Sequence, residues 1–271
     1  MTGTEVVLKP IYGIPSITPG SDIPTILLDG LRLSGISLQD NDVLVVTQKV
    51  VSKAQNRFVR LADVRPSKRA KLLANEVQKD PRLIEVILSE SSEVVAKRPG
   101  LLITRHKNGE VMANAGVDMS NLELEEDEGP TVLCLPHDPD QTAKQYRDYL
   151  SEATGYSVAV VISDSSGRAW RKGVTNLALG VCGLPSLVNL VGEPDLYGRR
   201  LEVTEVAFAD QIACAAGLLM GESSEGFPAV FIRGLRWTAE HRPGKALQRS
   251  IEEDLFAYQY QHFDSHDRTL S

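Results

Sequence analysis

The chain has 271 residues, of which 42% are hydrophobic and 24% charged, the composition of an ordinary globular protein. Its formal net charge of −7 (29 basic against 36 acidic residues) argues against a general nucleic-acid binder and still allows a local basic site for a phosphorylated small molecule. We find no signal-peptide pattern and no apolar run long enough to span a bilayer, so we expect no membrane partner. The three cysteines are far apart and form no CxxC pair, which indicates a reduced, cytoplasmic protein.

Hydrophobic periodicity predicts strands and helices along most of the chain, without an internal repeat or a clean domain boundary. The predicted elements, in order, are a strand over 4–11, a helix over 22–33, a buried strand over 42–46, helices starting near Ser67 and at Asp80-Pro81, a hairpin over 101–115, a short strand over 133–135, a helix capped by Asp140 and running to 154, a buried strand over 157–163, a strand over 201–206, a helix over 207–220, a strand over 228–232 and a last helix over 246–258. Residues 173–192 are rich in glycine and show no trustworthy period. These elements alone favour a doubly wound α/β sheet.

The strand predicted over 157–163 is rich in valine, as in a strand buried on both faces. It is followed by Asp164-Ser165-Ser166-Gly167, which predicts a turn, and then by a basic cluster. A carboxylate, two hydroxyls and basic side chains at the end of a buried strand are typical of sites for a metal-bound phosphate. A capped turn with solvated charges is the alternative interpretation.

Two other stretches place polar side chains just beyond predicted elements. The hairpin predicted around the Asn108-Gly109 turn is followed by Asp118 and Asn121. These two residues are therefore predicted in a loop just beyond a strand, where metal and phosphate ligands commonly lie. Lys49 and Lys53 share one side of the segment after the strand at 42–46, whether that segment is helical or extended.

The common nucleotide and hydrolase motifs, GxxxxGK[ST], GxGxxG and GxSxG, are absent. What remains is a set of hard-oxygen donors on separate loops, namely Asp118, Asp164 with Ser165, and Glu222. Such donors suit Mg²⁺ or Mn²⁺. Basic side chains that suit a polyanion accompany them: Lys49, Lys53, Arg168, Arg171 and Lys172.

Seven stretches, in order, extend this interpretation over nearly the whole chain. They are GIPSI (13–17), VLVVTQKVVSKA (43–54), NAGVDMSN (114–121), LPHDPD (135–140), VVISDSSGRAWRKGV (160–174), DLYGRRLEVTEVAFADQIA (195–213) and LLMGESSEGFPAVFIRG (218–234). Together they resemble the coenzyme F420-0:L-glutamate ligase family. No single stretch is decisive, but the seven in this order are highly specific.

The resemblance implies a GTP-dependent ligase that puts a γ-linked glutamate tail on the deazaflavin coenzyme F420. GTP would phosphorylate the terminal carboxylate of the lactyl phosphate arm of F420-0, and the amine of L-glutamate would displace phosphate from the acyl phosphate. The resemblance also implies an α+β fold with a large mixed sheet and flanking helices, two interlocked subdomains and an intertwined homodimer. We expect one ligase domain over 1–256 and a charged tail over 257–271.

The resemblance also assigns residues. Asp118, Asp164, Ser165 and Glu222 would hold the divalent cations, Mg²⁺ or Mn²⁺, two per site. K⁺ would be a further cation. GTP would contact Ile14, Pro15, Ser16, Ile17, Gln48, Lys53, Asn121, Met220, Gly221, Glu222, Ser223, Ser224, Glu225, Gly226 and Phe227. Charge and position alone, and not a matched motif, make Arg168, Arg171 and Lys172 catalytic candidates that would contact the coenzyme's phosphate or the transferred group.

Two other function classes stay open. A metal-dependent phosphohydrolase is suggested by the predicted Asp-Ser-Ser-Gly turn, although aspartyl-phosphate phosphatases need a second aspartate where this chain has Ser166. A non-catalytic nucleotide or deazaflavin binding protein is the third possibility, but a binder does not need carboxylates on three loops. Substitution of Asp164 separates the ligase from the binding protein, because a ligase loses turnover, whereas a binder should lose little of its ligand binding.

Overall fold

The computed structural model describes residues 5–122 and 129–254, which form two compact units. The first unit comprises residues 5–57 and Leu135–Leu247, and the second comprises 58–122, 129–134 and 248–254. The second unit is therefore made mainly by an insertion into the first. The tail expected over 257–271 lies outside the described residues.

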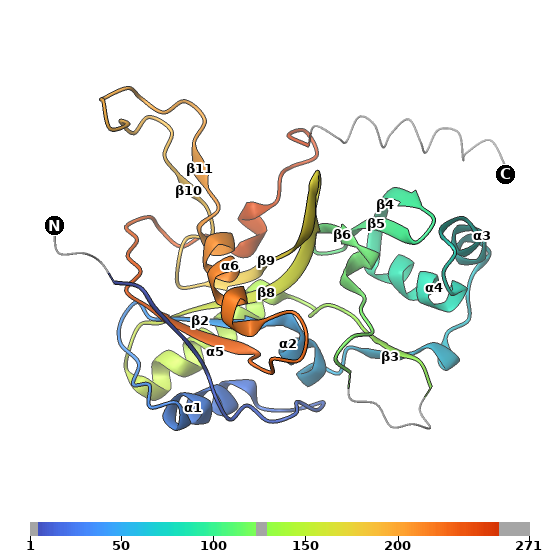
Figure 1. Cartoon of the computed structure of the whole chain (residues 1–271), viewed down its shortest axis with the longest axis horizontal. Helices are drawn as coiled ribbons and strands as arrows, with labels where there is room; N and C mark the ends of the chain where they lie inside the picture. Colours follow the sequence, from blue (N-terminus) through green and yellow to red (C-terminus); the bar gives the residue numbers. More distant parts are fainter. Residues whose placement is uncertain (1–4, 123–128, 255–271) are drawn as a thin grey trace. The chain divides into compact units, whose positions relative to one another are not determined.

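A five-stranded mixed sheet forms the centre of the first unit (Figure 1). In spatial order its strands are β1 (Val7–Pro10), β12 (Ala229–Arg233), β2 (Val43–Thr47), β8 (Ala159–Arg168) and β9 (Arg171–Cys182). Only β2 and β8 are parallel; the other neighbouring strands are antiparallel. The mixed α+β arrangement agrees with the fold that the resemblance implies, and the doubly wound parallel sheet is wrong.

Helices cover both faces of this sheet, which explains why β2 is apolar from Val43 to Val46 and β8 is apolar from Ala159 to Ile162. On one face lie α1 (Ile23–Leu33), α2 (Gln48–Ala54) and α5 (Pro139–Thr154), and on the other lies α6 (Phe208–Met220) (Figure 1). Leu44 and Val46 pack toward the three-helix face, whereas Val43 and Val45 pack toward α6. All four side chains are fully buried.

The polar residues at helix starts are mostly where the sequence predicts them. The Asp22 carboxylate accepts a hydrogen bond from the Thr25 amide at the start of α1, and Gly155 ends α5 with a left-handed φ of 78°. The cap of α5 is Asp138, not Asp140. Asp140 lies in the first turn, where its carboxylate accepts from the backbone amides of β9 and of the 3₁₀ turn η3 (Gly244–Leu247). It ties three segments of the first unit together.

The largest departure from the predicted elements is the hairpin of β8 and β9. The residues at 164–167, predicted as a turn, continue β8, and Asp164 pairs with Leu177 of β9. The actual turn lies between Arg168 and Arg171. The stretch 173–192, for which no element was predicted, contains most of β9. Cross-strand pairing, which a single-strand pattern does not report, supplies this strand.

A two-stranded arm projects from the first unit (Figure 1). Its base is the strand pair β10 (Val188–Asn189) and β11 (Glu205–Val206), so the strand predicted over 201–206 forms only at its end. Between them, Leu196, Tyr197 and Val203 are at least 86% exposed. The helix predicted over 246–258 is also absent as far as residue 254, since η3 ends at residue 247; its remainder lies outside the described residues.

The second unit packs two helices and small sheets around its own core. Its elements are β3 (Phe58–Arg60), the 3₁₀ turn η1 (Leu61–Asp63), α3 (Lys68–Val77), α4 (Pro81–Glu90), β4 (Ser91–Arg98), β5 (Leu101–His106), β6 (Val111–Ala113), the short turn η2 (Asn114–Gly116) and β7 (Thr131–Leu133). Ser67 and Asp80 cap α3 and α4, which confirms both predicted starts. The Asn108-Gly109 hairpin is confirmed between β5 and β6, and β4 completes a three-stranded sheet that the sequence did not predict. Within 5–122 and 129–254, no helix is long and apolar enough to cross a bilayer.

Candidate functional site

Four segments of the first unit emerge at one edge of its sheet. The carboxyl ends of the parallel strands β2 and β8 lie side by side, where Thr47 pairs with Ser163. Because β12 is antiparallel to β2 and β1 is antiparallel to β12, the start of β12 and the end of β1 lie at this same edge. We call residues 11–17, 47–53, 164–168 and 220–228 the loop edge. Ligands of α/β sheets commonly bind outside the carboxyl ends of parallel strands.

The first and last of these loops touch each other. The ring of Tyr12 contacts that of Phe227 edge-on, with 5.5 Å between their centroids. Ile17 is buried in the core of the three-helix face and Ile14 packs against it, while Pro15 and Ser16 are exposed. The structure therefore brings together two of the segments predicted to contact GTP.

The loop after α6 is held in shape by its own backbone and side chains. Gly221 has φ 70° and ψ −175°, a conformation that essentially only glycine adopts, and a side-chain carbon there would overlap the Glu225 carboxylate. That carboxylate accepts a hydrogen bond from the Ser223 amide at 2.9 Å, which lowers the pKa of Glu225 from its ordinary value. Glu222 is exposed beside this turn.

The segment after β2 is helical, which settles the choice between helix and extended chain. Gln48 is buried in the first turn of α2 and accepts a hydrogen bond from the Ser52 hydroxyl at 2.8 Å. Lys53 is half-buried in the last turn, on the same face as Lys49 one turn earlier.

The outer half of β8 presents its side chains alternately to the two faces of the sheet. Ser163 lies on the α6 side, where its hydroxyl is 4.0 Å from the sulfur of Met220. Ser165 continues on that side, whereas Asp164 follows Val160 and Ile162 on the side of α2. Neighbouring donors of the predicted cation site therefore point to opposite faces.

The basic cluster lies at the tip of this hairpin. Arg168, Arg171 and Lys172 are exposed around Trp170, whose φ is 60°. Arg168 is four residues beyond Asp164, or about 13 Å along an extended strand. Because residues 164–167 are extended, the catalytic candidates lie farther from Asp164 than they would after a turn at these residues. Their catalytic role stays a prediction.

The other predicted ligands, Asp118 and Asn121, belong to the second unit. The Asp118 carboxylate accepts hydrogen bonds from the Met119 amide at 2.7 Å, the Ser120 amide at 3.0 Å and the Ser120 hydroxyl at 2.7 Å. The Asp118 amide donates to the Leu133 carbonyl of β7 at 3.1 Å, and the Leu133 amide donates to the Asp118 carbonyl at 2.8 Å. An ionised carboxylate held in one orientation is the kind of donor that Mg²⁺ and Mn²⁺ use.

The turn that leads to Asp118 is left-handed. Asn114, Ala115 and Gly116 have φ of 55°, 52° and 69°. Left-handed backbone costs an L-residue about 1–2 kcal/mol, and asparagine and glycine tolerate it best. Lys79, which follows α3, donates a hydrogen bond to the Asn114 side-chain oxygen at 2.7 Å, and burial lowers the pKa of its ammonium group. The sequence patterns did not single out Lys79, because local patterns do not report a contact between residues that are 35 positions apart in the chain.

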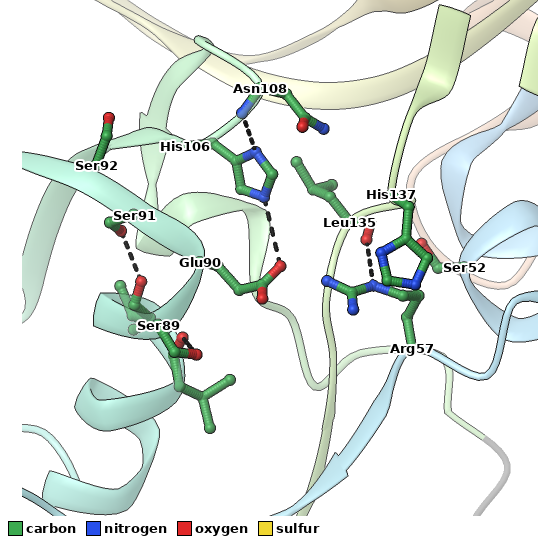
Figure 2. A network of polar contacts seen from close by, with 12 residues as sticks. Ser52, Arg57, Ser89, Glu90, Ser91, Ser92, His106, Asn108, Leu135 and His137 are labelled. Atoms are coloured by element: carbon green, nitrogen blue, oxygen red, sulfur yellow. Dashed lines mark hydrogen bonds and ion pairs between the residues drawn. The ribbon is translucent and has the colours of Figure 1, made fainter. Parts of the chain in front are cut away.

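A buried histidine closes the hairpin that precedes this turn (Figure 2). Nδ1 of His106 accepts a hydrogen bond from the Asn108 amide at 2.9 Å, and Nε2 lies 3.5 Å from the Glu90 carboxylate. Because Nδ1 accepts this hydrogen bond, the Nε2 side of the ring is the side that faces Glu90. Figure 2 also shows a separate contact of the first unit, from Nε of Arg57 to the Leu135 carbonyl at 2.8 Å. It links the two segments where the chain leaves and re-enters that unit.

Among the residues that the structure describes, no three His, Cys, Asp or Glu side chains gather closely enough to hold a metal ion. Asp164, Ser165 and Glu222 belong to the first unit, and Asp118 belongs to the second. By donor chemistry these residues fit Mg²⁺ or Mn²⁺, and their assignment as ligands stays a prediction.

Comparison with known proteins gives consistent matches over most of the chain. The family model described as F420-0:Gamma-glutamyl ligase matches residues 13–234. The coenzyme F420:L-glutamate ligase of Methanothermobacter thermautotrophicus is 42% identical over 248 residues, covering 91% of this chain and 96% of the relative. That of Methanopyrus kandleri is 40% identical over 255 residues (92% and 96%), and that of Archaeoglobus fulgidus is 42% identical over 251 residues (93% and 96%).

Proposed function

The chain belongs to the F420-0:gamma-glutamyl ligase family, and on that premise we propose that it adds L-glutamate to coenzyme F420-0 with GTP as phosphoryl donor. The family and its relatives' names support a ligase of coenzyme F420 biosynthesis. The proposal goes beyond these names in three respects: GTP is the phosphoryl donor, an acyl phosphate is the intermediate, and divalent cations take part.

The observation that carries this proposal is the convergence at the loop edge. Segments predicted to contact GTP come from residues 14–17, from α2 and from 220–227, which are far apart in sequence. The strand order brings all three to one edge of the sheet, beside Asp164 and Ser165. A nucleotide with bound cations needs such a concentration of backbone amides, hard-oxygen donors and a lysine.

The alternation along β8 suggests how two cations would be divided. Asp164 lies on the α2 side, and Ser165 lies on the α6 side, from which the chain continues into Glu222. One cation would be held by Asp164 and the other by Ser165 with Glu222. Bound there, the cations would neutralise charge that develops on the transferred phosphoryl group. Lys53 would orient the nucleotide phosphates.

The proposed reaction has two steps, phosphoryl transfer and amide-bond formation. The carboxylate of the coenzyme's lactyl phosphate arm takes the γ-phosphoryl group of GTP, which gives an acyl phosphate and GDP. The amine of L-glutamate then attacks the acyl carbon, the amide bond forms, and inorganic phosphate leaves with release of a proton. The exposed Arg168, Arg171 and Lys172 would attract the phosphate of the coenzyme or the transferred group.

Mass spectrometry of the coenzyme after incubation with F420-0, L-glutamate, GTP and Mn²⁺ tests the proposal. We expect a product heavier by one or more glutamyl units, formed together with GDP and only when GTP is present. Phosphate release without a heavier coenzyme would support a phosphohydrolase instead. That alternative also loses its motif here, because 164–167 form part of β8 and not a turn. Binding without any reaction would support a binding protein.

Substitution Lys53→Ala is expected to weaken GTP binding by about tenfold and to change glutamate binding much less, because one phosphate contact of a lysine is lost. Two calorimetric titrations, one with GTP and Mn²⁺ and one with glutamate, measure this. Lys144→Ala is the control, because it removes an exposed lysine of α5 that is not among the predicted binding residues. An equal loss of affinity for both ligands in Lys53→Ala would contradict the assignment.

We also propose that the chain forms a homodimer through its projecting arm. Leu196, Tyr197 and Val203 expose apolar surface that a monomer leaves in water. Light scattering coupled to size-exclusion chromatography is expected to give twice the chain mass of 29.6 kDa. A mass equal to one chain across micromolar concentrations would refute the dimer.

A further inference from the structure

We propose that Lys79 is a positioning residue for the reaction, one that holds Asp118 and Asn121 in their binding geometry through its hydrogen bond to Asn114. The inference rests on the proposed function, because it gives Asp118 and Asn121 their roles as cation and nucleotide ligands. Lys79 itself is not placed in contact with substrate.

The first step of the argument is that the turn before Asp118 needs to be held. Three consecutive left-handed residues, Asn114, Ala115 and Gly116, are rare because Ala115 carries a side chain that disfavours this region. The methyl group of Ala115 is fully buried in the core of the second unit, with Leu102 and Val132. Burial fixes the middle of the turn, and Asn114 at its start is fixed by Lys79.

The second step is that Lys79 is anchored at its own backbone. Gln78 ends α3 with a left-handed φ of 53°, and the Lys79 amide then donates to the Ala74 carbonyl at 3.1 Å. The next residue, Asp80, caps α4. The ammonium group therefore reaches Asn114 from a rigid junction between two helices, and its half-buried surroundings strengthen the hydrogen bond.

The third step is that the turn transmits its geometry to the ligands. The Val117 amide donates to the Asn114 carbonyl at 3.0 Å, and Asp118 then forms two backbone hydrogen bonds with Leu133. The Asp118 carboxylate is in turn fixed by the two residues that follow it. A rotation at Asn114 would therefore move the start of this segment.

The experiment removes the hydrogen bond from either side. Lys79→Met keeps the length of the side chain without a donor, and Asn114→Gly keeps the freedom for positive φ without an acceptor. Lys79→Arg restores a cationic donor. Mn²⁺ binding in the presence of GTP is measured by electron paramagnetic resonance, and amide hydrogen exchange is measured over residues 114–121 and at Leu133.

We expect Lys79→Met and Asn114→Gly each to weaken Mn²⁺ binding about tenfold, or about 1.4 kcal/mol, and to speed amide exchange at Val117 and Leu133 at least tenfold. The double variant is expected to resemble the single variants, because both remove one shared bond. Lys79→Arg is expected to bind Mn²⁺ within about threefold of the unsubstituted protein.

Glu85→Ala is the control for a loss of stability alone. It removes the bond from the Ser67 amide to the Glu85 carboxylate at 2.7 Å, elsewhere in the second unit. Equal weakening of Mn²⁺ binding in Glu85→Ala and Lys79→Met would overturn the proposal, as would normal Mn²⁺ binding in Lys79→Met. If the unsubstituted protein binds neither Mn²⁺ nor GTP while exchange still accelerates in Lys79→Met, the proposed function fails and Lys79 is structural only.

Discussion

Replacement of Asp164 by asparagine is expected to lower turnover for glutamate addition at least about a hundredfold, or about 2.7 kcal/mol of transition-state stabilisation. The two side chains have the same shape, so the substitution removes a negative charge and little else. Asp164 is half-buried on the α2 side of β8, where its backbone pairs with Leu177. A neutral amide there would hold a divalent cation weakly and leave charge on the transferred phosphoryl group unbalanced. The measurement is the initial rate of product formation, followed by mass spectrometry at saturating GTP and Mn²⁺.

The matched control for this substitution is Asp40→Asn, at the opposite edge of the same two strands. Asp40 precedes β2, and its carboxylate accepts a hydrogen bond from the Ser157 amide just before β8. An asparagine oxygen can accept the same bond, so we expect near-normal turnover. Near-normal turnover in Asp164→Asn at saturating Mn²⁺ would remove Asp164 from the site. Normal GTP hydrolysis without glutamate addition would instead assign Asp164 to a later step.

The sequence predicts the members of the candidate site better than their arrangement. The seven matched stretches name the segments of the loop edge, but only the strand order β1-β12-β2-β8 shows that these segments meet. Motif spacing carries no information on strand order, because antiparallel partners such as β1 and β12 are more than 200 residues apart. Lys79 illustrates the same limit in the second unit, since its contact with Asn114 depends on a helix junction outside every matched stretch.

For the fold, the elements predicted correctly are those with a strong local signal. The helix starts predicted at Asp22, near Ser67 and at Asp80 are confirmed, since each of these residues caps its helix, and the apolar runs 42–46 and 157–163 form the parallel pair at the centre of the sheet. The β8–β9 hairpin was missed because serine and glycine favour turns when taken alone. Here Ser165 and Ser166 are extended because Asn176 and Thr175 pair with them. Tertiary pairing overrides local preference at the place where the predicted cation ligands lie.

The substitution expected to cost the most stability is Asp42→Ala, by about 3–5 kcal/mol, with a decrease in Tm on the order of 10 °C. Asp42 is 1% exposed, and its two oxygens accept from Nε and Nη2 of Arg233 at 2.8 and 2.6 Å. The Gln39 amide also donates to it at 2.7 Å. Alanine would leave a partly buried guanidinium group without its counterion and a backbone amide without its acceptor. The free energy of unfolding is measured by urea titration.

A surface ion pair of the same unit provides the comparison that separates burial from charge. Arg32 and Asp29 of α1 form a bond of 2.8 Å, but their side chains are 75% and 59% exposed. Water and salt screen such pairs, so Asp29→Ala is expected to change the free energy of unfolding by less than about 1 kcal/mol. The double substitution Asp42→Ala with Arg233→Met is expected to recover part of the loss, because it removes the stranded charge along with its partner. If Asp42→Ala costs no more than Asp29→Ala, this buried pair does not stabilise the junction of β2 and β12.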